Sequence, residues 1–562
     1  MRIFPMPHPA RRLLALPLAA LLATAAAAQS SAPLASANRF AVVNAGTPRV
    51  ADPKLAGGSI PVRYRLEGPA ATASVVIEIF RGIDPVATLY GGTEAIGSAI
   101  HEHVWDGKWT DGKFADPGAY VVRVSATPTG GAEAHADLAL SLVRLGITEI
   151  AAQSSGSTTN EWPLVYYKKG GAYGFFATPQ IHEYLNVADA GQVSDLDLDD
   201  GSARPPVPVH LDLASPPLEG TIYEDDAYNF PLCYAASSQP ALQVRFGSTG
   251  TSMLLNGSIG AGFPVDGVDL RVVASDGAGD WTPSGPIAAG DSATITGPAL
   301  PGSVARTDRT VVFRWQWKEG SSAWRDVPGS LPIALRFYTV LGTPLFAPGA
   351  TGTAHAGPWV EVVDTMVSWS QALGVDPSDE AHLVEVGIRG FFGQTGSLTT
   401  AIKGVCYDCP SMGGDGGANH YFNAGTKYVA LSKLLNAHAS GKYVNCSDVA
   451  SSTSSMLSML GVANLHMLRL GAMSLNAIWG IGTPGYTVNL WGTGHSFSYH
   501  HIVTRDGGTN VSDACMWVDE DGSPGSLPGT PGINVDRPWT SYMPLAATNS
   551  VTKTLDILPK LQ

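Results

Sequence analysis

The 562-residue sequence has few charged residues and few cysteines, and after its first segment it has no long apolar run. Charged residues make up 15% of the chain and hydrophobic residues 44%, which excludes a disordered chain, because such a chain combines low hydrophobicity with high charge. The low charge content also excludes a long coiled coil. Acidic residues outnumber basic ones, 48 to 34, and there is no basic stripe, so we expect no nucleic-acid partner.

Glycine and proline are abundant instead, with 64 and 40 residues. They follow no three-residue period, which excludes collagen. An excess of turn-forming residues in a hydrophobic, weakly charged chain indicates a large globular protein with much β structure. At roughly 150 residues per domain, the length predicts about three or four domains.

Residues 1–28 have the pattern of a secretory signal peptide. Arg2, Arg11 and Arg12 precede a short apolar run from Leu13 to Leu22, and Ala-rich residues follow up to Ala28. The run is too short for a membrane span, and no later segment approaches 18 apolar residues. We therefore expect a secreted or periplasmic protein with no membrane span.

Residues 40–145 have the pattern of a small antiparallel sandwich. Short β-rich runs are separated by Asp106-Gly107, Asp111-Gly112 and a Pro-Gly turn that leads into Tyr120, which is the chemistry of tight hairpins. This segment resembles the immunoglobulin-like repeat of flagellar hook-cap proteins and many secreted bacterial enzymes. The resemblance implies a fold and no particular function.

The rest of the chain divides by its pattern of strands and helices. Residues 146–250 and 251–343 continue in short strands and predict a β-rich domain and a sandwich-like β domain. After residue 344, apolar residues recur at helical spacing in 359–373 and 428–439, and strand-like segments follow at 465–470, 487–490, 497–504 and 511–518. Helices followed by strands predict an α+β domain over residues 344–562.

The strongest chemical signal is Cys446 at the start of a predicted third helix. Val449, Thr453, Met456, Leu457 and Leu460 form an apolar stripe at helical spacing, and Gly461 is placed to end the helix. A helix N-terminus favours a thiolate, and its free N–H groups are placed to serve an oxyanion.

A cysteine nucleophile needs a base, and the base needs an orienting partner. Residues 499–504 and 511–518 predict two strands joined by a turn, which sets His500 or His501 opposite Asp513. A carboxylate there would hold the imidazole in the tautomer that takes the thiol proton.

The ordered Cys446-Ser447-Asp448-Val449-Ala450 run, the histidine strand and the Asp513 strand together resemble the transglutaminase-like superfamily of papain-type cysteine enzymes. The resemblance covers about residues 344–562 and favours His500 over His501 as the base. It departs from the family at Ile502, where the family often has Trp, and after Asp513, which no Pro follows. It implies acyl transfer through a thioester on Cys446, with His500 as base, Asp513 as its orienting residue, and protein or peptide amides as substrates.

Five cysteines are an odd number for an oxidising compartment. Cys406 and Cys409 are close enough in sequence for a local disulfide, Cys233 and Cys515 are candidates for another, and Cys446 is then expected to stay free. We expect no cofactor and no metal site. The acidic run 195–200 lacks the later bidentate acid of a calcium loop, and His420 alone does not complete a zinc site with Cys406 and Cys409.

Two alternatives stay open beside a hydrolase or acyltransferase. The first is a non-catalytic adhesion or glycan-binding protein, with a cell-wall or surface glycan as partner, because about 300 residues of β structure precede the candidate site. The second is an amidase similar to peptide:N-glycanase, an activity that also occurs in the superfamily. The sequence does not decide between water and an amine as the acyl acceptor.

Overall fold

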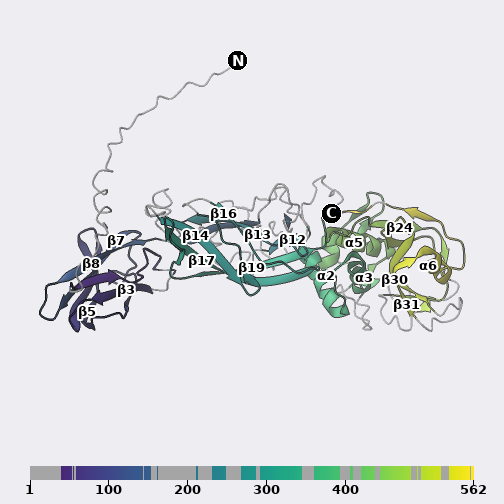
Figure 1. Ribbon diagram of the computed structural model, residues 1–562. Coiled ribbons are helices and arrows are strands. Elements are labelled where there is room, and N and C mark those ends of the chain that lie inside the picture. Colours follow the sequence, from purple (N-terminus) through teal and green to yellow (C-terminus); the bar gives the residue numbers. More distant parts are fainter. Residues whose placement is uncertain are drawn as a thin grey trace, which may run out of the picture.

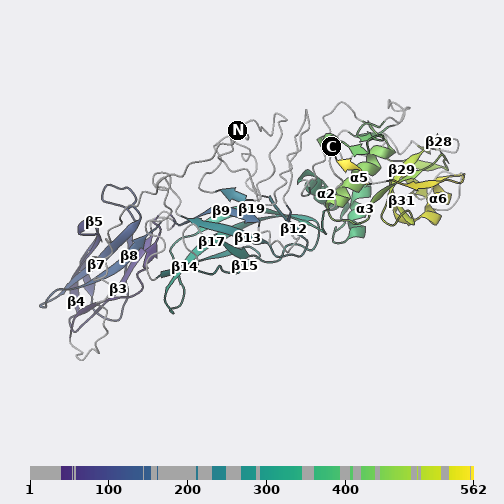
Figure 2. The same ribbon diagram turned by 90° about the horizontal axis from the view of Figure 1, so that it is seen from above.

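The computed structural model describes most of the chain after residue 38. The described residues are 39–143 (without 54 and 56–58), 145–152, 161–162, 210–212, 231–247, 268–286, 292–344, 358, 360–392, 405–408, 419–436, 443–481, 490–491, 495–520, 531–556 and 558–561. They form a β-rich multidomain protein with three units in a row along the chain (Figures 1 and 2). The expected signal peptide, 1–28, lies outside the described residues.

The first unit consists of two sheets that share one buried core. One sheet has the order β1 (Ala41–Asn44), β3 (Ile60–Glu67), β6 (His101–Trp105). The other has the order β2 (Val50–Ala51), β8 (Ala134–Leu142), β7 (Gly118–Pro128), β4 (Thr72–Arg81), β5 (Asp84–Ala95). Alternate residues of β3 are buried, as expected for a strand with one face on the core. The β-rich runs of the sequence at 61–66, 74–80 and 119–126 lie within β3, β4 and β7, and β8 follows the run that was expected to be the last strand.

The predicted Asp-Gly turns are present, and their aspartates have a local role. The Asp106 and Asp111 side chains accept hydrogen bonds from the backbone N–H two residues later, at 3.0 Å in each case. The following Gly107 and Gly112 have φ of 71° and 83°, which an L side chain rarely adopts. Both turns lie in the connection between β6 and β7, which belong to different sheets, so the expected turn residues are present but do not close a hairpin between these two strands.

The middle unit spans both of the β domains that the sequence predicts for 146–343. One sheet has the order β11 (His210–Asp212), β9 (Gly146–Ala152), β13 (Ala241–Gly247), β16 (Ser292–Thr296). The other has the order β10 (Glu161–Trp162), β12 (Pro231–Ala235), β19 (Leu331–Val340), β17 (Ala305–Glu319), β14 (Val268–Asp276), β15 (Gly279–Asp280), with β18 (Arg325–Asp326) beside β17. Because strands from both sides of residue 250 pair with each other and share one core, the structure places them in one unit rather than two.

The third unit has a central sheet with helices against it. The sheet order is β27 (Leu490–Trp491), β26 (Ile478–Gly480), β30 (Asn510–Asp519), β29 (His500–Thr504), β24 (His466–Leu470), β32 (Lys553–Leu555), and β31 (Pro531–Pro538) pairs with β30. Two strand pairs and one three-stranded sheet are also present in this unit. The pairs are β20 (Cys406–Tyr407) with β23 (Tyr443–Val444) and β25 (Met473–Ser474) with β28 (Ser496–Phe497), and the sheet has the order β21 (Phe422–Asn423), β22 (Tyr428–Val429), β33 (Lys560–Leu561).

The helices of this unit agree with the sequence only in part. The predictions of α2 (Val360–Leu373) and α5 (Cys446–Met459) are confirmed. The helix expected over 428–439 is wrong at its start, because 428–429 form β22 and α4 begins at Leu431; α4 is described as Leu431–Asn436, and 437–439 lie outside the described residues. Two more helices were not predicted: α3 (Glu380–Gly390) and α6 (Trp539–Ala546).

The second and third units meet at the C-terminal end of α5. The Leu341 N–H donates to Leu460 O at 2.9 Å, and the Tyr338 hydroxyl donates to Asp364 Oδ1 on α2 at 2.9 Å. Gly461 follows the helix with φ 92°, and a Cβ there would lie 2.3 Å from the backbone of Gly342. Gly461 therefore ends α5, as predicted, and also allows two backbones to meet closely.

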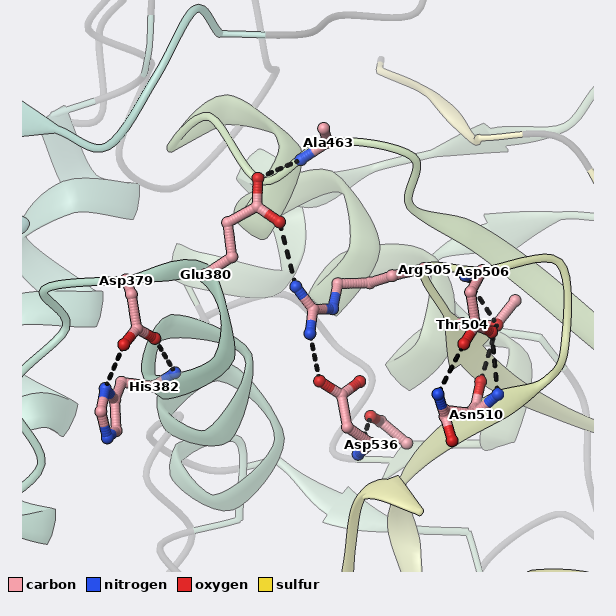
Figure 3. A network of polar contacts seen from close by, with 10 residues as sticks. Asp379, Glu380, His382, Ala463, Thr504, Arg505, Asp506, Asn510 and Asp536 are labelled. Atoms are coloured by element: carbon pink, nitrogen blue, oxygen red, sulfur yellow. Dashed lines mark hydrogen bonds and ion pairs between the residues drawn. The ribbon is translucent and has the colours of Figure 1, made fainter. Parts of the chain in front are cut away.

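A polar network fixes the β29–β30 hairpin relative to α3 and β31 (Figure 3). Arg505 Nη1 donates to Glu380 Oε2 at 3.0 Å, and Arg505 Nη2 donates to Asp536. Within the turn, Asp506 Oδ1 accepts from the Asn510 N–H at 2.8 Å, and the Thr504 hydroxyl donates to Asn510 O at 2.7 Å. The hairpin that carries the candidate base and carboxylate is therefore held on both sides.

Candidate active site

Cys446 is the first residue of α5, and a capping box holds it there. The Asn445 Oδ1 accepts hydrogen bonds from the N–H groups of Ser447 at 2.9 Å and Asp448 at 3.1 Å, and the Asp448 side chain accepts from the Asn445 N–H. The Cys446 side chain is 6% exposed, so it sits at the edge of the core rather than fully inside it.

The capping box changes one expectation about this helix end. The N–H groups of Ser447 and Asp448 already donate to Asn445, so they do not serve an oxyanion as the sequence suggested. An oxyanion at this position would have to be met by the N–H of Cys446 itself or by a neighbouring segment. The helix dipole still favours negative charge at Cys446.

Asp448 ties a second segment to this helix end. Its two oxygens accept from the N–H groups of Asn445 at 3.1 Å, His420 at 3.0 Å, Tyr421 at 2.8 Å and Phe422 at 2.7 Å. Burial raises the pKa of Asp448, and these backbone hydrogen bonds oppose the shift. The aspartate of the Cys-x-Asp run therefore has a scaffolding role, which the sequence did not predict.

The structure brings His500 and Asp513 together on neighbouring strands. Their contact joins His500 Nε2 to Asp513 Oδ2 at 3.0 Å, and both side chains are at most 1% exposed. Val503 pairs with Ser512 across the ladder, so His500 reaches Asp513 diagonally rather than directly opposite it. Asp513 Oδ1 also accepts from the Cys515 N–H at 2.8 Å.

The environment of His500 favours its protonated form. Burial alone would lower its pKa, but the Asp513 charge and hydrogen bonds to Asp513 and Cys446 raise the pKa to about 10. Asp513 occupies Nε2, so Nδ1, for which the described residues offer no partner other than Cys446, is the ring nitrogen that faces the thiol. The Phe497 ring stacks on the imidazole with centroids 5.4 Å apart.

His501 belongs to a different set of contacts. Its Nδ1 lies 2.8 Å from Ser447 Oγ, and its Nε2 lies 4.0 Å from Asp556 Oδ2. Burial, and then the charge of His500, lower the pKa of His501 to about 4. Of the two candidate bases, the structure places His500 with Cys446 and Asp513, and it places His501 with Ser447.

Two tyrosines that the sequence reasoning missed complete the surroundings. Tyr407 lies on β20, whose parallel pairing with β23 sets Tyr407 beside Val444, two residues before Cys446. Burial and the Cys446 charge raise the pKa of Tyr407, and a hydrogen bond with Cys446 adds to the shift. Tyr542 on α6 donates from its hydroxyl to Asp513 Oδ2 at 2.8 Å.

No sequence signal pointed to Tyr542, because Pro544 inside the segment argues against a helix there. Tyr407 stands next to Cys406, for which the sequence predicted only a local disulfide. Its pairing with the strand before Cys446 is a long-range contact that local sequence does not reveal.

The expected Cys233–Cys515 disulfide is absent, and this expectation is corrected. Both residues are buried free thiols, with Cys233 on β12 of the middle unit and Cys515 on β30 of the third. Each packs in the core as a small apolar side chain. The expected Cys406–Cys409 disulfide cannot be placed, since Cys409 lies outside the described residues. The expectation that four cysteines pair therefore fails for one pair, while Cys446 is a free thiol.

Among the described residues, no three His, Cys, Asp or Glu side chains are grouped to hold a metal ion. The acidic run 195–200 lies outside the described part of the chain. Within that part, no helix is long and apolar enough to cross a bilayer.

No family model and no curated protein matches this sequence. Among solved structures, one similar chain is the "tetra-tandem repeat in extending region of large adhesion protein", with 10% identity, a TM-score of 0.13, and coverage of 53% of this chain and 74% of that one. Another is the Bacteroides ovatus mixed-linkage glucan utilization locus (MLGUL) SGBP-B in complex with mixed-linkage heptasaccharide, with 8% identity, a TM-score of 0.11, and coverage of 56% and 69%. Scores this low indicate neither a shared overall fold nor a function.

Proposed function

We propose that this protein is a secreted, cysteine-dependent acyl-transfer enzyme of the transglutaminase-like type, which acts on protein or peptide amides. The observation that carries the proposal is the contact set around His500, whose Nε2 is bonded to Asp513 while Cys446 stands at a helix N-terminus beside it. A nucleophile, a base and an orienting carboxylate in this order are the parts that thioester chemistry requires.

In the first half of the reaction, the Cys446 proton moves to His500 Nδ1, and the sulfur attacks the carbonyl carbon of the amide. The C–N bond then breaks as His500 returns the proton to the leaving amine, which leaves a thioester on Cys446. The raised pKa of His500 supports this role, because it favours the state in which the proton rests on the imidazole. Asp513 stabilises that positive charge and fixes which ring nitrogen faces the sulfur.

In the second half, water or an amine attacks the thioester carbon and gives a proton to His500. The C–S bond breaks, the proton returns to sulfur, and the product is an acid or a new amide. Both acceptors fit the same residues, so hydrolysis and transamidation remain two outcomes of one site.

The finer fold assignments belong to the same proposal. The two sheets around one core in residues 40–145 support an immunoglobulin-like sandwich. The Tyr120 hydroxyl, which donates to Asp116 O at 2.8 Å, resembles the corner tyrosine of such sandwiches. A helix that delivers a cysteine to a sheet carrying histidine and aspartate supports a papain-like third unit. The signal-like pattern of residues 1–28 supports export.

The test compares Cys446→Ser with Cys233→Ser in the full chain. Cys233 is a matched control, because it is also a free buried thiol, and burial raises its pKa far above neutral. We expect iodoacetamide at pH 7 to label wild type at Cys446, as mapped by peptide mass spectrometry. We also expect the Cys446→Ser variant to lose labelling there and to lose all turnover of casein, of glutamine peptides with an added amine, and of an N-glycopeptide.

The Cys233→Ser variant should keep both labelling at Cys446 and turnover. Labelling of wild type at another cysteine, or at none, would contradict the proposal. Turnover that survives Cys446→Ser would contradict it as well. The substrate that reacts decides between water and amine as acceptor.

A further inference from the structure

We propose that Tyr542 is a positioning residue of this site: by donating to the Asp513 oxygen that also accepts from His500, it sets how strongly Asp513 holds the imidazole. This inference deepens the proposed function, and its catalytic consequence rests on that function. The contact itself can be tested without any substrate.

The geometry places two donors on one carboxylate oxygen. Asp513 Oδ2 accepts from the Tyr542 hydroxyl at 2.8 Å and from His500 Nε2 at 3.0 Å, while Oδ1 accepts from the Cys515 N–H at 2.8 Å. Tyr542 is 0% exposed and Asp513 is 1% exposed, so solvent does not replace either donor. Three donors at these distances satisfy a buried carboxylate that would otherwise be costly to bury.

The helix that carries Tyr542 is fixed against the same strands. The Trp539 N–H donates to Thr509 O at 2.8 Å at the start of α6, in the β29–β30 turn. At its end, the Asn476 side chain donates to the carbonyl oxygens of Pro544 and Leu545 at 2.8 and 3.2 Å. The hydroxyl of Tyr542 is thus held toward Asp513 by contacts at both ends of α6.

A shared acceptor makes the two hydrogen bonds compete. Charge on Oδ2 that the Tyr542 hydroxyl stabilises is less available to the imidazolium of His500. Removing the hydroxyl leaves His500 as the main partner of Oδ2, and the positive form of His500 is then held more strongly. The other titratable groups that face this pair come from α5, β20, β29 and β30, and they are Cys446, Tyr407, His501 and Cys515.

The experiment measures the titration of His500 by NMR in the full chain with labelled histidine, and His500→Gln identifies the signal. We expect Tyr542→Phe to raise the pKa of His500 by about 0.5 or more. Site-specific 3-fluorotyrosine at position 542 is a stronger donor of the same shape, and it should lower that pKa. Asp513→Asn should also lower it.

Tyr338→Phe is the matched control, because Tyr338 is equally buried and its hydroxyl also donates to an aspartate, Asp364, away from the site. It should leave the pKa of His500 unchanged. The inference is overturned if Tyr542→Phe moves the pKa of His500 no further than Tyr338→Phe does. If the phenylalanine variant does not fold, an unchanged pKa with 3-fluorotyrosine overturns it equally.

The two proposals fail in different ways. A wild-type protein that turns over no amide and whose Cys446 does not react would refute the proposed function, while the shift of His500 would still support the coupling. An active enzyme whose His500 does not respond to Tyr542 would refute only the coupling. If both proposals hold, Tyr542→Phe should move the alkaline limb of the pH profile of kcat/KM to higher pH, which a loss of packing alone would not do.

Discussion

Two rows of polar side chains run side by side through α5 and β29, and they differ in the charge state that they favour for their histidine. They begin at adjacent residues of the helix and pass through adjacent residues of the strand. The His500 row consists of Cys446, His500, Asp513 and Tyr542. The His501 row consists of Ser447, His501, Asp556 and Lys427.

The difference comes from the carboxylate that each histidine meets. Asp513 lies 3.0 Å from His500, and among the described residues no Lys or Arg is paired with Asp513. Its negative charge therefore acts on His500, and the pKa of His500 rises to about 10. Asp556 lies 4.0 Å from His501 and is already paired with Lys427 at 2.8 Å, so burial dominates and the pKa of His501 falls to about 4. At neutral pH these values favour a positively charged His500 and an uncharged His501, and only the positively charged ring is suited to stabilise a thiolate.

The largest expected effect separates the two carboxylates. Asp513→Asn should lower the rate of iodoacetamide labelling at Cys446, together with any amide turnover, by about 10³-fold or more, because the amide neither stabilises the imidazolium nor fixes its tautomer. Asp556→Asn should change both rates by less than about threefold, because that carboxylate does not touch the His500 row. Equal losses in the two variants would mean that the rows are not functionally distinct.

Sequence patterns predicted those elements of the third unit that are determined by residues close together in the chain. The apolar stripe and Gly461 give α5, and the turn residues between Thr504 and Asn510 give the hairpin. Those two elements carry Cys446, His500 and Asp513, which is why the three could be named from the sequence. The same patterns do not show the strand register, which sets His500 diagonally across from Asp513 rather than directly opposite it.

The missed residues depend on contacts between distant segments. Tyr542 reaches Asp513 from a helix 29 positions later that contains a proline, and no local rule predicts such a helix. Cys233 and Cys515 are free thiols on strands of different units, although both pack into the same hydrophobic core, and spacing alone does not reveal that they stay unpaired. The β strands of the middle unit pair across residue 250, so the boundary expected there is not one that local sequence patterns could place correctly.

A smaller effect is expected in the pH dependence of stability, and it tests the charge state of His501. A lowered pKa in the folded state means that the unfolded chain binds the proton first, so stability falls as pH decreases from 6.5 toward 4. The loss is at most about 3 kcal/mol. Replacing His501 with Asn, which keeps an acceptor for Ser447, should remove this part of the acid sensitivity.

The measurement is hydrogen exchange of β29 peptides in urea at pH 7 and pH 4.5. The exposed His382 on α3 provides the control, and His382→Asn should keep the acid sensitivity of wild type. If His501→Asn and wild type lose the same stability between the two pH values, His501 is not held neutral in the fold.

The smallest expected effect concerns Ser447, which supports His501 rather than the chemistry. Because His501 is neutral and its Nε2 faces Asp556, its Nδ1 accepts from the Ser447 hydroxyl. Ser447→Ala leaves that buried nitrogen without a donor and should cost about 1–2 kcal/mol in the unfolding of the third unit. Ser451→Ala is the matched control, since Ser451 is equally buried on α5 but, among the described residues, its hydroxyl bonds only to Asp448 O of its own helix. Its loss should cost only a few tenths of a kcal/mol. Labelling of Cys446 should change less than about threefold in both variants. Equal costs would show that the Ser447–His501 contact adds nothing to the fold, and a large loss of labelling in Ser447→Ala alone would show that the His501 row reaches into the site after all.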